Sequence, residues 1–512
     1  MVMNLKKVLF IKNAVILTAT SLILRFIGIF FKVWLAAAVG SEGIGLYQLI
    51  FSVYMLAATF ATSGISTAVT RLVSDELVLG SRKGVITILR KSVMLTALIA
   101  LISTAAVYFL ATPIARYGVG DMRAVPALKT LSISLPFMGI SSCIKGYFIA
   151  RRKTLPSSIS QIFEQLVRIG VVVTLVCSTA HKGIEHACTA VLVGDTVAEA
   201  ASMLLTVLFY LSDKKYLNRL HGRDYPPYGV AGQIVRIAAP ISGGRYLNTA
   251  LRTVENMLVP AGLITFGMGN AAALSNFGMI KGMALPVLFF PSSLLGAVST
   301  LLIPEICEAR VKNQNGVVAS VLRRCLKITA LSGCLFGAFF LVCGENVGRL
   351  VYKDNAVGEL ITAIAPLTPL MYLDSVCDGI LKGLDEQGFT FKNSFIDCLI
   401  RIALVWFIVP RHGMAGFIGV MYVSNIFTCA MNVGRLIAVT KVKIRFFRGG
   451  VLPFVLSGAA CFGVSSALKL VPMSDLAYMV ALLVLCTLVY IILLRLAGVT
   501  IKGELLSLFR FK

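Results

Sequence analysis

Long apolar stretches that recur along the whole chain limit what it can fold into more than any other feature. Five of them contain no Asp, Glu, Lys or Arg, and they cover residues 92–115, 282–304, 328–344, 412–434 and 476–494. A helix needs about 20 apolar residues to cross the hydrocarbon core of a bilayer. A membrane β-strand would alternate polar and apolar residues over about ten positions, and these stretches do not alternate. The sequence therefore predicts an all-α polytopic membrane protein.

Composition and charge distribution support this interpretation. Of the 512 residues, 57% are hydrophobic and 14% are charged, which is unlike a soluble globular chain. A net charge of +25 would suggest a nucleic-acid partner in a soluble protein, but here Lys and Arg concentrate in alternate loops, for example at 82–91, 151–153, 310–327 and 435–448. The positive-inside rule places such loops in the cytoplasm. We therefore expect a multi-pass bacterial inner-membrane protein with both termini cytoplasmic and no nucleic-acid partner.

The apolar pattern predicts about fourteen transmembrane helices and four regions of the chain. The predicted spans are 13–38, 44–68, 92–112, 126–150, 155–179, 184–212, 232–262, 274–303, 326–348, 359–381, 389–410, 413–438, 449–471 and 475–498. A long polar connection near the middle of the first twelve spans predicts a linker. We expect an N-lobe of six helices in 1–212, a cytoplasmic linker in 213–231, a C-lobe of six helices in 232–440, and two further helices with a cytoplasmic tail in 441–512.

Internal repetition favours two lobes of the same orientation. Pro136, Glu164 and Arg168 recur at the same spacing as Pro369, Asp397 and Arg401, and a Lys-Gly pair lies between the proline and the acid in both copies. Six predicted helices separate equivalent positions, so both copies cross the membrane in the same direction. Such parallel repeats are related by an axis along the membrane normal, and the substrate path is expected between them.

Charged residues inside predicted spans indicate a functional site. A charge at mid-bilayer costs at least a few kcal/mol, so it needs a partner, a cavity or the interface. Arg25 and Lys32 stand seven residues apart in the first helix, as Arg245 and Arg252 do in the seventh, which puts each pair on one helix face. Glu255, three residues after Arg252, can contact substrate or act as a local ion-pair partner. Snorkelling of these side chains to the interface is the structural alternative.

Acids in the tenth and eleventh helices form a candidate ion site. Asp374 and Asp378 share one face of the tenth helix near two prolines, and carboxylates beside freed carbonyls can bind H⁺ or Na⁺. Asn393 and Asp397 are oxygen ligands on the eleventh helix and offer a competing cation site. The acid-x-x-x-Arg pairs 164/168 and 397/401 are interpreted as intrahelical ion pairs. No C-x-x-C pair or phosphate-binding loop occurs, so we expect no metal site and no cofactor apart from a coupling ion.

Three sequence segments resemble a known family. They are Ser-Leu-Ile-Leu-Arg-Phe-Ile-Gly at 21–28, Gly-Ser-Glu-Gly-Ile-Gly-Leu-Tyr-Gln-Leu at 40–49, and Thr-Ser-Gly-Ile-Ser-Thr-Ala-Val at 62–69. Together with Gly-Met-Ala-Leu-Pro at 282–286 and Leu-Ile-Pro-Glu at 302–305, they resemble stage V sporulation protein B-like and MurJ-like flippases. These belong to the multidrug/oligosaccharidyl-lipid/polysaccharide (MOP) superfamily, and the resemblance covers essentially the whole chain.

The resemblance implies two MATE-like six-helix lobes around a central cavity, two extra C-terminal helices, and alternating access. It also implies export of an undecaprenyl pyrophosphate-linked sugar, with peptidoglycan lipid II as the expected substrate. Arg25 matches the first-helix arginine of the MurJ-type flippases, and Asn393 and Asp397 match part of their sodium site. We expect a monomeric transporter surrounded by membrane lipids, coupled to Na⁺ or H⁺, and not an enzyme, because the short loops carry no catalytic constellation. The alternative is a MATE-type cation-coupled drug or metabolite antiporter, whose cavity should be acidic.

Overall fold

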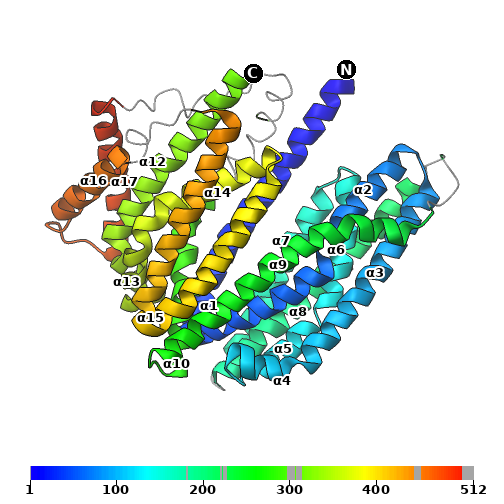
Figure 1. The fold of residues 1–512 in the computed structure, drawn as a ribbon, viewed down its shortest axis with the longest axis horizontal. Helices are drawn as coiled ribbons and strands as arrows, with labels where there is room; N and C mark the ends of the chain where they lie inside the picture. The colour runs from blue at the N-terminus through cyan, green and yellow to red at the C-terminus, as the bar shows by residue number, and fades with distance from the viewer. Residues whose placement is uncertain are drawn as a thin grey trace. The chain divides into compact units, whose positions relative to one another are not determined.

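The computed structural model describes residues 2–179, 183–218, 222, 228–293, 295–296, 306, 314–442 and 451–498, with side chains from residue 16 onward. Every regular element among these residues is a helix (Figure 1). The chain forms two compact units, residues 1–278 and residues 279–512. The expected all-α polytopic fold is confirmed, because ten of the described helical segments are long and apolar enough to cross a membrane.

The first unit contains the helices of the N-terminal half. They are α1 (Val2–Thr62), α2 (Ile65–Val78), α3 (Arg82–Phe109), α4 (Ala111–Pro113), the π-helix η1 (Ile114–Val119), α5 (Ala124–Ser132), α6 (Leu135–Ala150), α7 (Leu155–Thr179), α8 (Ile184–Leu217), α9 (Val230–Thr265) and α10 (Asn270–Gly278). Buried side chains of α2, α3 and α6 form the core of this unit, among them Val69, Ile88 and Tyr147. Helix α9 packs along α1, α2 and α3.

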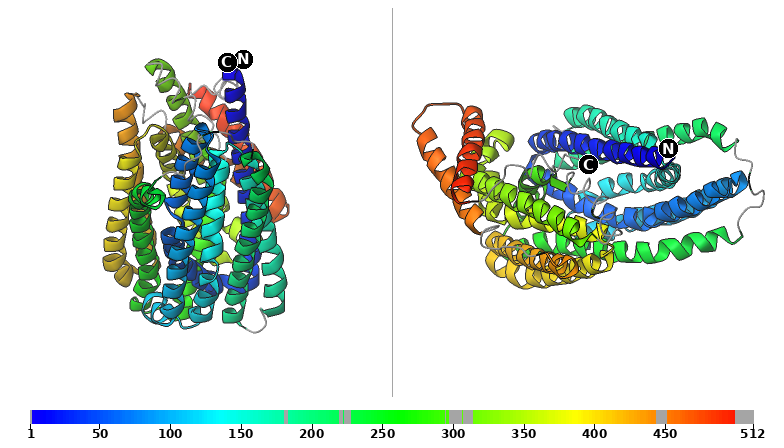
Figure 2. Two further views of the ribbon diagram at one scale, coloured as in Figure 1. Left: turned by 90° about the vertical axis from the view of Figure 1, so that its right-hand side faces the viewer. Right: turned by 90° about the horizontal axis from the view of Figure 1, so that it is seen from above.

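In the second unit, α12 packs against several of the other helices. The elements of this unit are the π-helix η3 (Met279–Ala284), α12 (Asn315–Val347), the π-helix η4 (Gly348–Tyr352), α13 (Asn355–Ile364), the 3₁₀ helix η5 (Ala365–Leu367), α14 (Thr368–Gly383), α15 (Gln387–Thr440), α16 (Leu452–Leu468) and α17 (Asp475–Leu496). Helices α16 and α17 lie side by side against α12 (Figure 2). Leu331 of α12 packs there with Ala460, Tyr490 and Leu494.

Two glycines divide the longest helices where the sequence predicts a boundary between spans. Helix α1 is interrupted at Gly40 (φ 78°) and α15 at Gly413 (φ 57°). Both torsions lie in the left-handed region, which glycine adopts without steric cost. The predicted spans end and begin at 38 and 44 around the first glycine, and at 410 and 413 at the second. Each long helix therefore contains two predicted membrane crossings.

The number of fourteen spans and the division into two six-helix lobes stay predictions. Parts of the predicted spans 274–303 and 449–471 lie outside the described residues, as does most of the predicted linker. Helix α9 is not among the ten apolar segments, because Arg236, Arg245, Arg252 and Glu255 interrupt its hydrophobic sequence. Helix α9 belongs to the compact unit 1–278, and the predicted division into lobes places it at the start of the second lobe.

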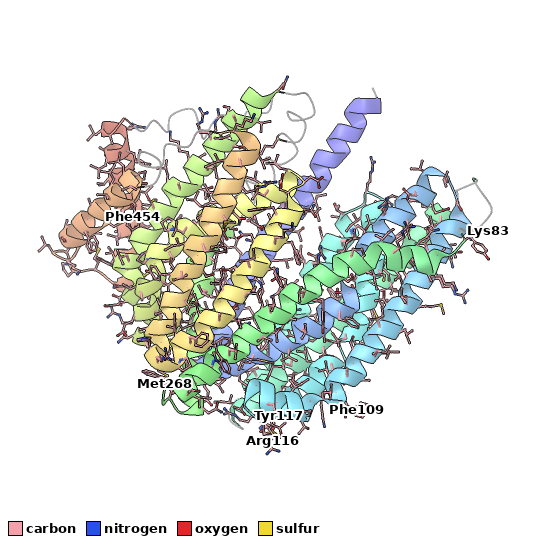
Figure 3. All side chains as sticks on the ribbon, in the orientation of Figure 1. Lys83, Phe109, Arg116, Tyr117, Met268 and Phe454 are labelled. Atoms are coloured by element: carbon pink, nitrogen blue, oxygen red, sulfur yellow. The ribbon has the colours of Figure 1, made fainter. Side chains whose placement is uncertain are left out.

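One end of the first unit carries the aromatic and basic side chains typical of a membrane–water interface. Figure 3 shows Lys83 and Phe109 at opposite ends of α3, with Arg116 and Tyr117 near the Phe109 end. Phe109 is 79% exposed and Tyr117 is 81% exposed. The Arg116 guanidinium lies 5.6 Å from the centre of the Tyr117 ring. Aromatic and basic residues anchor helix ends at the headgroup level, so we expect this end of the unit to lie at the interface.

Small residues allow α1 and α10 to approach closely. A Cβ atom on Gly278 would lie 2.2 Å from the carbonyl oxygen of Ser41 and 2.5 Å from the nitrogen of Gly45. The hydroxyls of Ser41 and Ser275 form a hydrogen bond of 2.7 Å beside this contact. Membrane helices have no hydrophobic driving force for association, so close backbone packing of small residues holds them together.

We expect Gly278→Val to disrupt this packing. Overpacking a close contact costs about 1–3 kcal/mol or more, and here the clash is with backbone that cannot move aside. Thermal unfolding of the detergent-solubilised protein should shift to lower temperature, and the amount of protein in the membrane should fall. Gly170→Val in α7 is the matched control, because nothing lies within 4 Å of its Cβ position. Equal melting of the two variants would contradict the predicted packing role.

Candidate functional site

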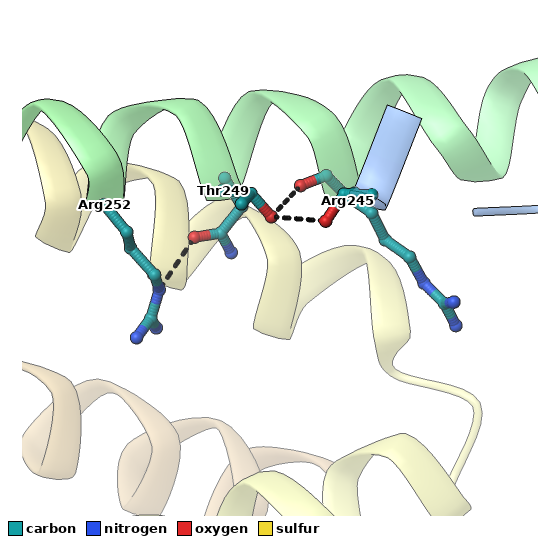
Figure 4. Close-up of a pocket in the computed structure, with 5 residues that line it drawn as sticks. Arg245, Thr249 and Arg252 are labelled. Atoms are coloured by element: carbon teal, nitrogen blue, oxygen red, sulfur yellow. Dashed lines mark hydrogen bonds between the residues drawn. The ribbon is translucent and has the colours of Figure 1, made fainter. Parts of the chain in front are cut away.

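A pocket on the polar face of α9 is the first candidate site. Its volume is about 270 Å³, and it is lined by Thr59 of α1 and by Arg245, Asn248, Thr249 and Arg252 of α9 (Figure 4). The four α9 residues are spaced 3, 1 and 3 positions apart, so one helix face presents all of them. The structure thus brings Arg245 and Arg252 to the same pocket, as expected from their spacing.

Hydrogen bonds orient the lining side chains. Nε of Arg252 donates to Oδ1 of Asn248 at 3.1 Å, and the Thr249 hydroxyl donates to the Arg245 carbonyl at 2.9 Å (Figure 4). The hydroxyls of Thr59 and Thr249 lie 3.4 Å apart. Both arginines are exposed, so their remaining guanidinium N–H groups are accessible for binding a ligand. A lining of two guanidinium groups, two hydroxyls and an amide without a carboxylate favours an anion such as phosphate.

Three other predicted residues lie outside the lining of this pocket. Arg25 and Lys32 are exposed on α1, and neither forms an ion pair among the residues that the structure describes. Glu255 is 3% exposed, does not line the pocket, and has interactions of its own. The roles assigned to these three residues from the sequence stay predictions.

Polar contacts that sequence reasoning did not identify fix α9 against the neighbouring helices. The Thr253 hydroxyl donates to the Ser52 carbonyl at 3.0 Å, and Nδ2 of Asn256 donates to the Ser52 hydroxyl at 2.9 Å. Further along, the Ser242 hydroxyl donates to the Ser63 carbonyl at 2.6 Å. Because these bonds lie on both sides of the pocket residues along α9, they hold the pocket face in one rotational setting.

A polar cluster in the second unit is the second candidate site, and we call Asp374, Asn393, Asp397, Ser424 and Asn432 the α14–α15 cluster. Nδ2 of Asn432 donates to Asp374 at 2.8 Å, and Nδ2 of Asn393 donates to Oδ1 of Asn432 at 2.9 Å. The Ser424 hydroxyl donates to Asp397 at 2.6 Å. Oδ1 of Asn393 is buried and has no hydrogen-bond partner. Carboxylate, amide and hydroxyl oxygens are the ligands that hard monovalent cations prefer.

The predicted ion-site residues divide into two groups. Asp374 and Asn393 are joined through Asn432, and Asp397 is bonded to Ser424; the partners Asn432 and Ser424 were not predicted. Asp378 instead forms an ion pair with Lys382, one turn further along α14. An i, i+4 acid–base pair is a local structural contact, so the geometry gives Asp378 a different environment from Asp374.

A third group of charges lies inside the first unit. Arg168 pairs with Glu164 at 3.1 Å, which confirms this intrahelical pair. Arg168 also lies 2.8 Å from Oδ1 of Asp195 on α8, and Lys145 of α6 lies 3.6 Å from Glu164. The partners on α6 and α8 were not predicted, because the sequence does not show which faces of separate helices meet.

The family comparison matches the polysaccharide biosynthesis protein family over residues 10–309, more than half of the chain. Stage V sporulation protein B of Bacillus subtilis (strain 168) is 28% identical over 90% of this chain and 89% of its own length. Lipid II flippase MurJ of the same organism is 20% identical over 77% of this chain and 76% of its own length.

Two solved structures share the fold. One is described as lipid II flippase MurJ in an inward closed conformation, and it has a TM-score of 0.71 and 17% identity, covering 94% of this chain and 98% of that one. The other is an inward-facing multidrug resistance MATE family transporter of the MOP superfamily, with a TM-score of 0.58 and 11% identity over 84% of this chain and 100% of that one. The chain therefore belongs to the polysaccharide biosynthesis protein family, as a polytopic α-helical membrane protein that shares its fold with these two transporters.

Proposed function

We propose that the protein flips an undecaprenyl pyrophosphate-linked oligosaccharide, and specifically peptidoglycan lipid II, across the inner membrane by alternating access. The observation that supports this best is the α9 pocket, in which Arg245 and Arg252 face one space without a lining carboxylate. In this proposal the protein acts as a monomer, with both termini in the cytoplasm. The likeness to stage V sporulation protein B and to MurJ supports a cell-envelope precursor as the substrate.

The chemistry of the pocket suits a pyrophosphate headgroup. Arginine presents a rigid fork of N–H donors that matches two oxygens of one phosphate. The axial rise between Arg245 and Arg252 is about 10.5 Å, but their long side chains can converge on one group. The undecaprenyl chain stays in the bilayer, because burying it in a polar pocket would lose its favourable contact with lipid.

The direct test is to deplete the protein and identify the lipid-linked intermediate that accumulates on the cytoplasmic face. We expect lipid II to accumulate there, and purified protein in vesicles should move labelled lipid II between leaflets. If a different undecaprenyl-linked sugar accumulates, the proposed flippase function stands and that sugar replaces lipid II as the proposed substrate. If no lipid-linked sugar accumulates and the cells become sensitive to cationic drugs, the antiporter function replaces the flippase function. The MATE-like fold accommodates both functions.

Substitutions of Arg25 test whether this residue contacts the substrate as it crosses between the leaflets. Its neighbours at i±3 and i±4 are Leu22, Ser21, Gly28 and Ile29, so its own helix supplies no carboxylate, and its guanidinium is exposed. A pyrophosphate can pair with this charge when substrate is present, and water must hydrate it otherwise. We expect Arg25→Ala nearly to abolish flipping, and Arg25→Lys to lose part of it because the planar fork is absent.

Arg25→Ala should reach the membrane at normal abundance, because removing a mid-span charge eases insertion, and Arg25→Lys should do so because it keeps the wild-type charge. Arg495→Ala, an exposed position at the end of α17, is the control and should flip at the wild-type rate. Full activity of Arg25→Ala at normal abundance would show that Arg25 is a structural or snorkelling residue.

The α14–α15 cluster is the proposed binding site for the coupling ion, Na⁺ or H⁺. A ligand can shift the balance between two conformations only through different affinity for them. Asn393 and Asp397 on the first half of α15 bond to Ser424 and Asn432 on its second half, across the break at Gly413. An ion that draws these oxygens together would therefore change how the two halves of α15 meet.

A further inference from the structure

Five ionisable side chains in the first unit form a group that the proposed function does not use. We call Lys145 of α6, Glu164 and Arg168 of α7, and Asp195 and Glu199 of α8 the α6–α8 cluster. All five lie in helical segments that are long and apolar enough to cross the membrane. Helices α7 and α8 pack along each other, which brings the acids of one against the base of the other.

Contacts inside the cluster leave one carboxylate oxygen without a partner. Asp195 is 6% exposed, and its Oδ1 lies 2.8 Å from Nε of Arg168, an ion pair by distance in which Nε does not have the geometry of a hydrogen-bond donor. Its other oxygen, Oδ2, is buried without any hydrogen-bond donor. Glu164 is shared by Arg168 at 3.1 Å and Lys145 at 3.6 Å. Leaving a charged acceptor buried and unsatisfied is costly, so the geometry points to a missing proton or donor at Asp195.

The charge balance of the α6–α8 cluster gives the same result. Three carboxylates face two cations, so the cluster carries one excess negative charge when every group is ionised. Asp195 and Glu199 stand four residues apart on one face of α8, where like charges repel each other. Glu199 lies within electrostatic reach of the other four members. A buried net charge inside a membrane segment costs several kcal/mol, and one proton would remove it.

The surroundings favour a proton over a metal cation. Among the described residues, the phenols of Tyr47 and Tyr54 on α1 also lie within electrostatic reach of the Asp195 carboxylate, and a phenol carries no charge near pH 7. Helix α5 also packs on α8, but the amine of its Lys129 lies over the Tyr108 ring. A metal ion would have to bind next to Lys145 and Arg168, whose charges repel it. A proton needs only one carboxylate oxygen.

We propose that the α6–α8 cluster binds one proton on the Asp195–Glu199 carboxylate pair, and that this proton is taken up and released during the flipping cycle. The step is the addition of H⁺ to a carboxylate oxygen to give a neutral carboxylic acid, and its reversal. The second half of the proposal rests on the proposed flippase function. The site is separate from the α14–α15 cluster, which belongs to the other unit.

Infrared spectroscopy of the purified full-length protein tests proton binding without transport. Wild type should show the carbonyl band of a protonated carboxylic acid at neutral pH, which shifts in deuterated water and disappears as pH rises. Asp195→Asn combined with Glu199→Gln should lower the intensity of this band by the contribution of one carboxylic acid, and Glu199→Gln alone should move the pH at which that contribution disappears. Both amides imitate the neutral acid in shape, so the variants should fold. Asp475→Asn, which breaks an exposed pair with Arg349, should keep the wild-type band.

Two results would overturn the proton site. One is a wild-type protein that lacks the band at every pH at which it stays folded, and the other is a band whose intensity is the same in the double variant as in wild type. Flipping of labelled lipid II tests the coupling: wild type should respond to pH, and the double variant should give a flat profile. If wild type shows the carboxylic acid band but flips lipid II at a rate that does not depend on pH, the coupling between the proton and flipping is overturned. A band without any lipid II flipping would instead overturn the proposed substrate and leave the proton site standing.

Discussion

Replacing Arg245 and Arg252 together by Ala is expected to abolish flipping. Each guanidinium can form two charge-assisted hydrogen bonds with a pyrophosphate, and such bonds contribute about 1.5–3 kcal/mol each. Since about 1.4 kcal/mol corresponds to a factor of ten, each single variant should lose roughly tenfold or more in the rate at subsaturating substrate. The double variant should then fall to the level of vesicles without protein.

The measurement is the loss of accessible labelled lipid II from one leaflet of vesicles that contain equal amounts of each variant. Arg245→Lys and Arg252→Lys keep the charge and lose the fork, so they should retain intermediate activity. Arg236→Ala is the matched control, because Arg236 is exposed on the same helix and does not line the pocket. If Arg236→Ala and the double variant lose flipping equally, the effect comes from the total charge of α9 and not from the pocket.

The amino-acid sequence contained enough information to predict the helices and several of their ends. Hydrophobic length decides whether a segment crosses the membrane, and this property is local. The boundaries at Gly40 and Gly413 followed from short interruptions in the apolar pattern, although α1 and α15 continue as helices on both sides of each break. The Glu164–Arg168 pair was also predictable, because it needs only the periodicity of one helix.

Contacts between helices could not be predicted in the same way. Asn432 lies 39 residues after its partner Asn393, and Asp195 lies on a different helix from Arg168. Whether such residues meet depends on the rotation and crossing of two helices, which the spacing within each helix does not determine. Asp378 shows a local ambiguity, since Asp374 and Lys382 both stand four positions from it, and the structure pairs it with Lys382. The opposite charge decides between two equivalent neighbours.

Asp397→Asn is expected to remove the dependence of flipping on the coupling ion. Asp397 is 7% exposed, and its Oδ1 accepts a hydrogen bond from Ser424 across the break in α15. Asparagine keeps an oxygen at the same position but removes the negative charge that would neutralise a bound cation. The variant should therefore flip at a low rate that does not change when the Na⁺ gradient or the proton gradient is removed, whereas wild type should slow down when the gradient of its coupling ion is removed.

The control for this experiment must remove a carboxylate without touching the cluster. Asp378→Asn serves this purpose, because Asp378 lies on the same helix as Asp374 but pairs with Lys382 at a partly exposed position. It should keep the wild-type response to the ion, although a direct role of Asp378 in ion binding would make it behave like Asp397→Asn. Wild-type flipping that is unchanged after removal of both gradients would contradict ion coupling altogether. An unchanged ion response in Asp397→Asn would place the coupling site outside the α14–α15 cluster. A site that uses the Asp397 carboxylate to bind a cation would bind it more weakly once the negative charge is removed.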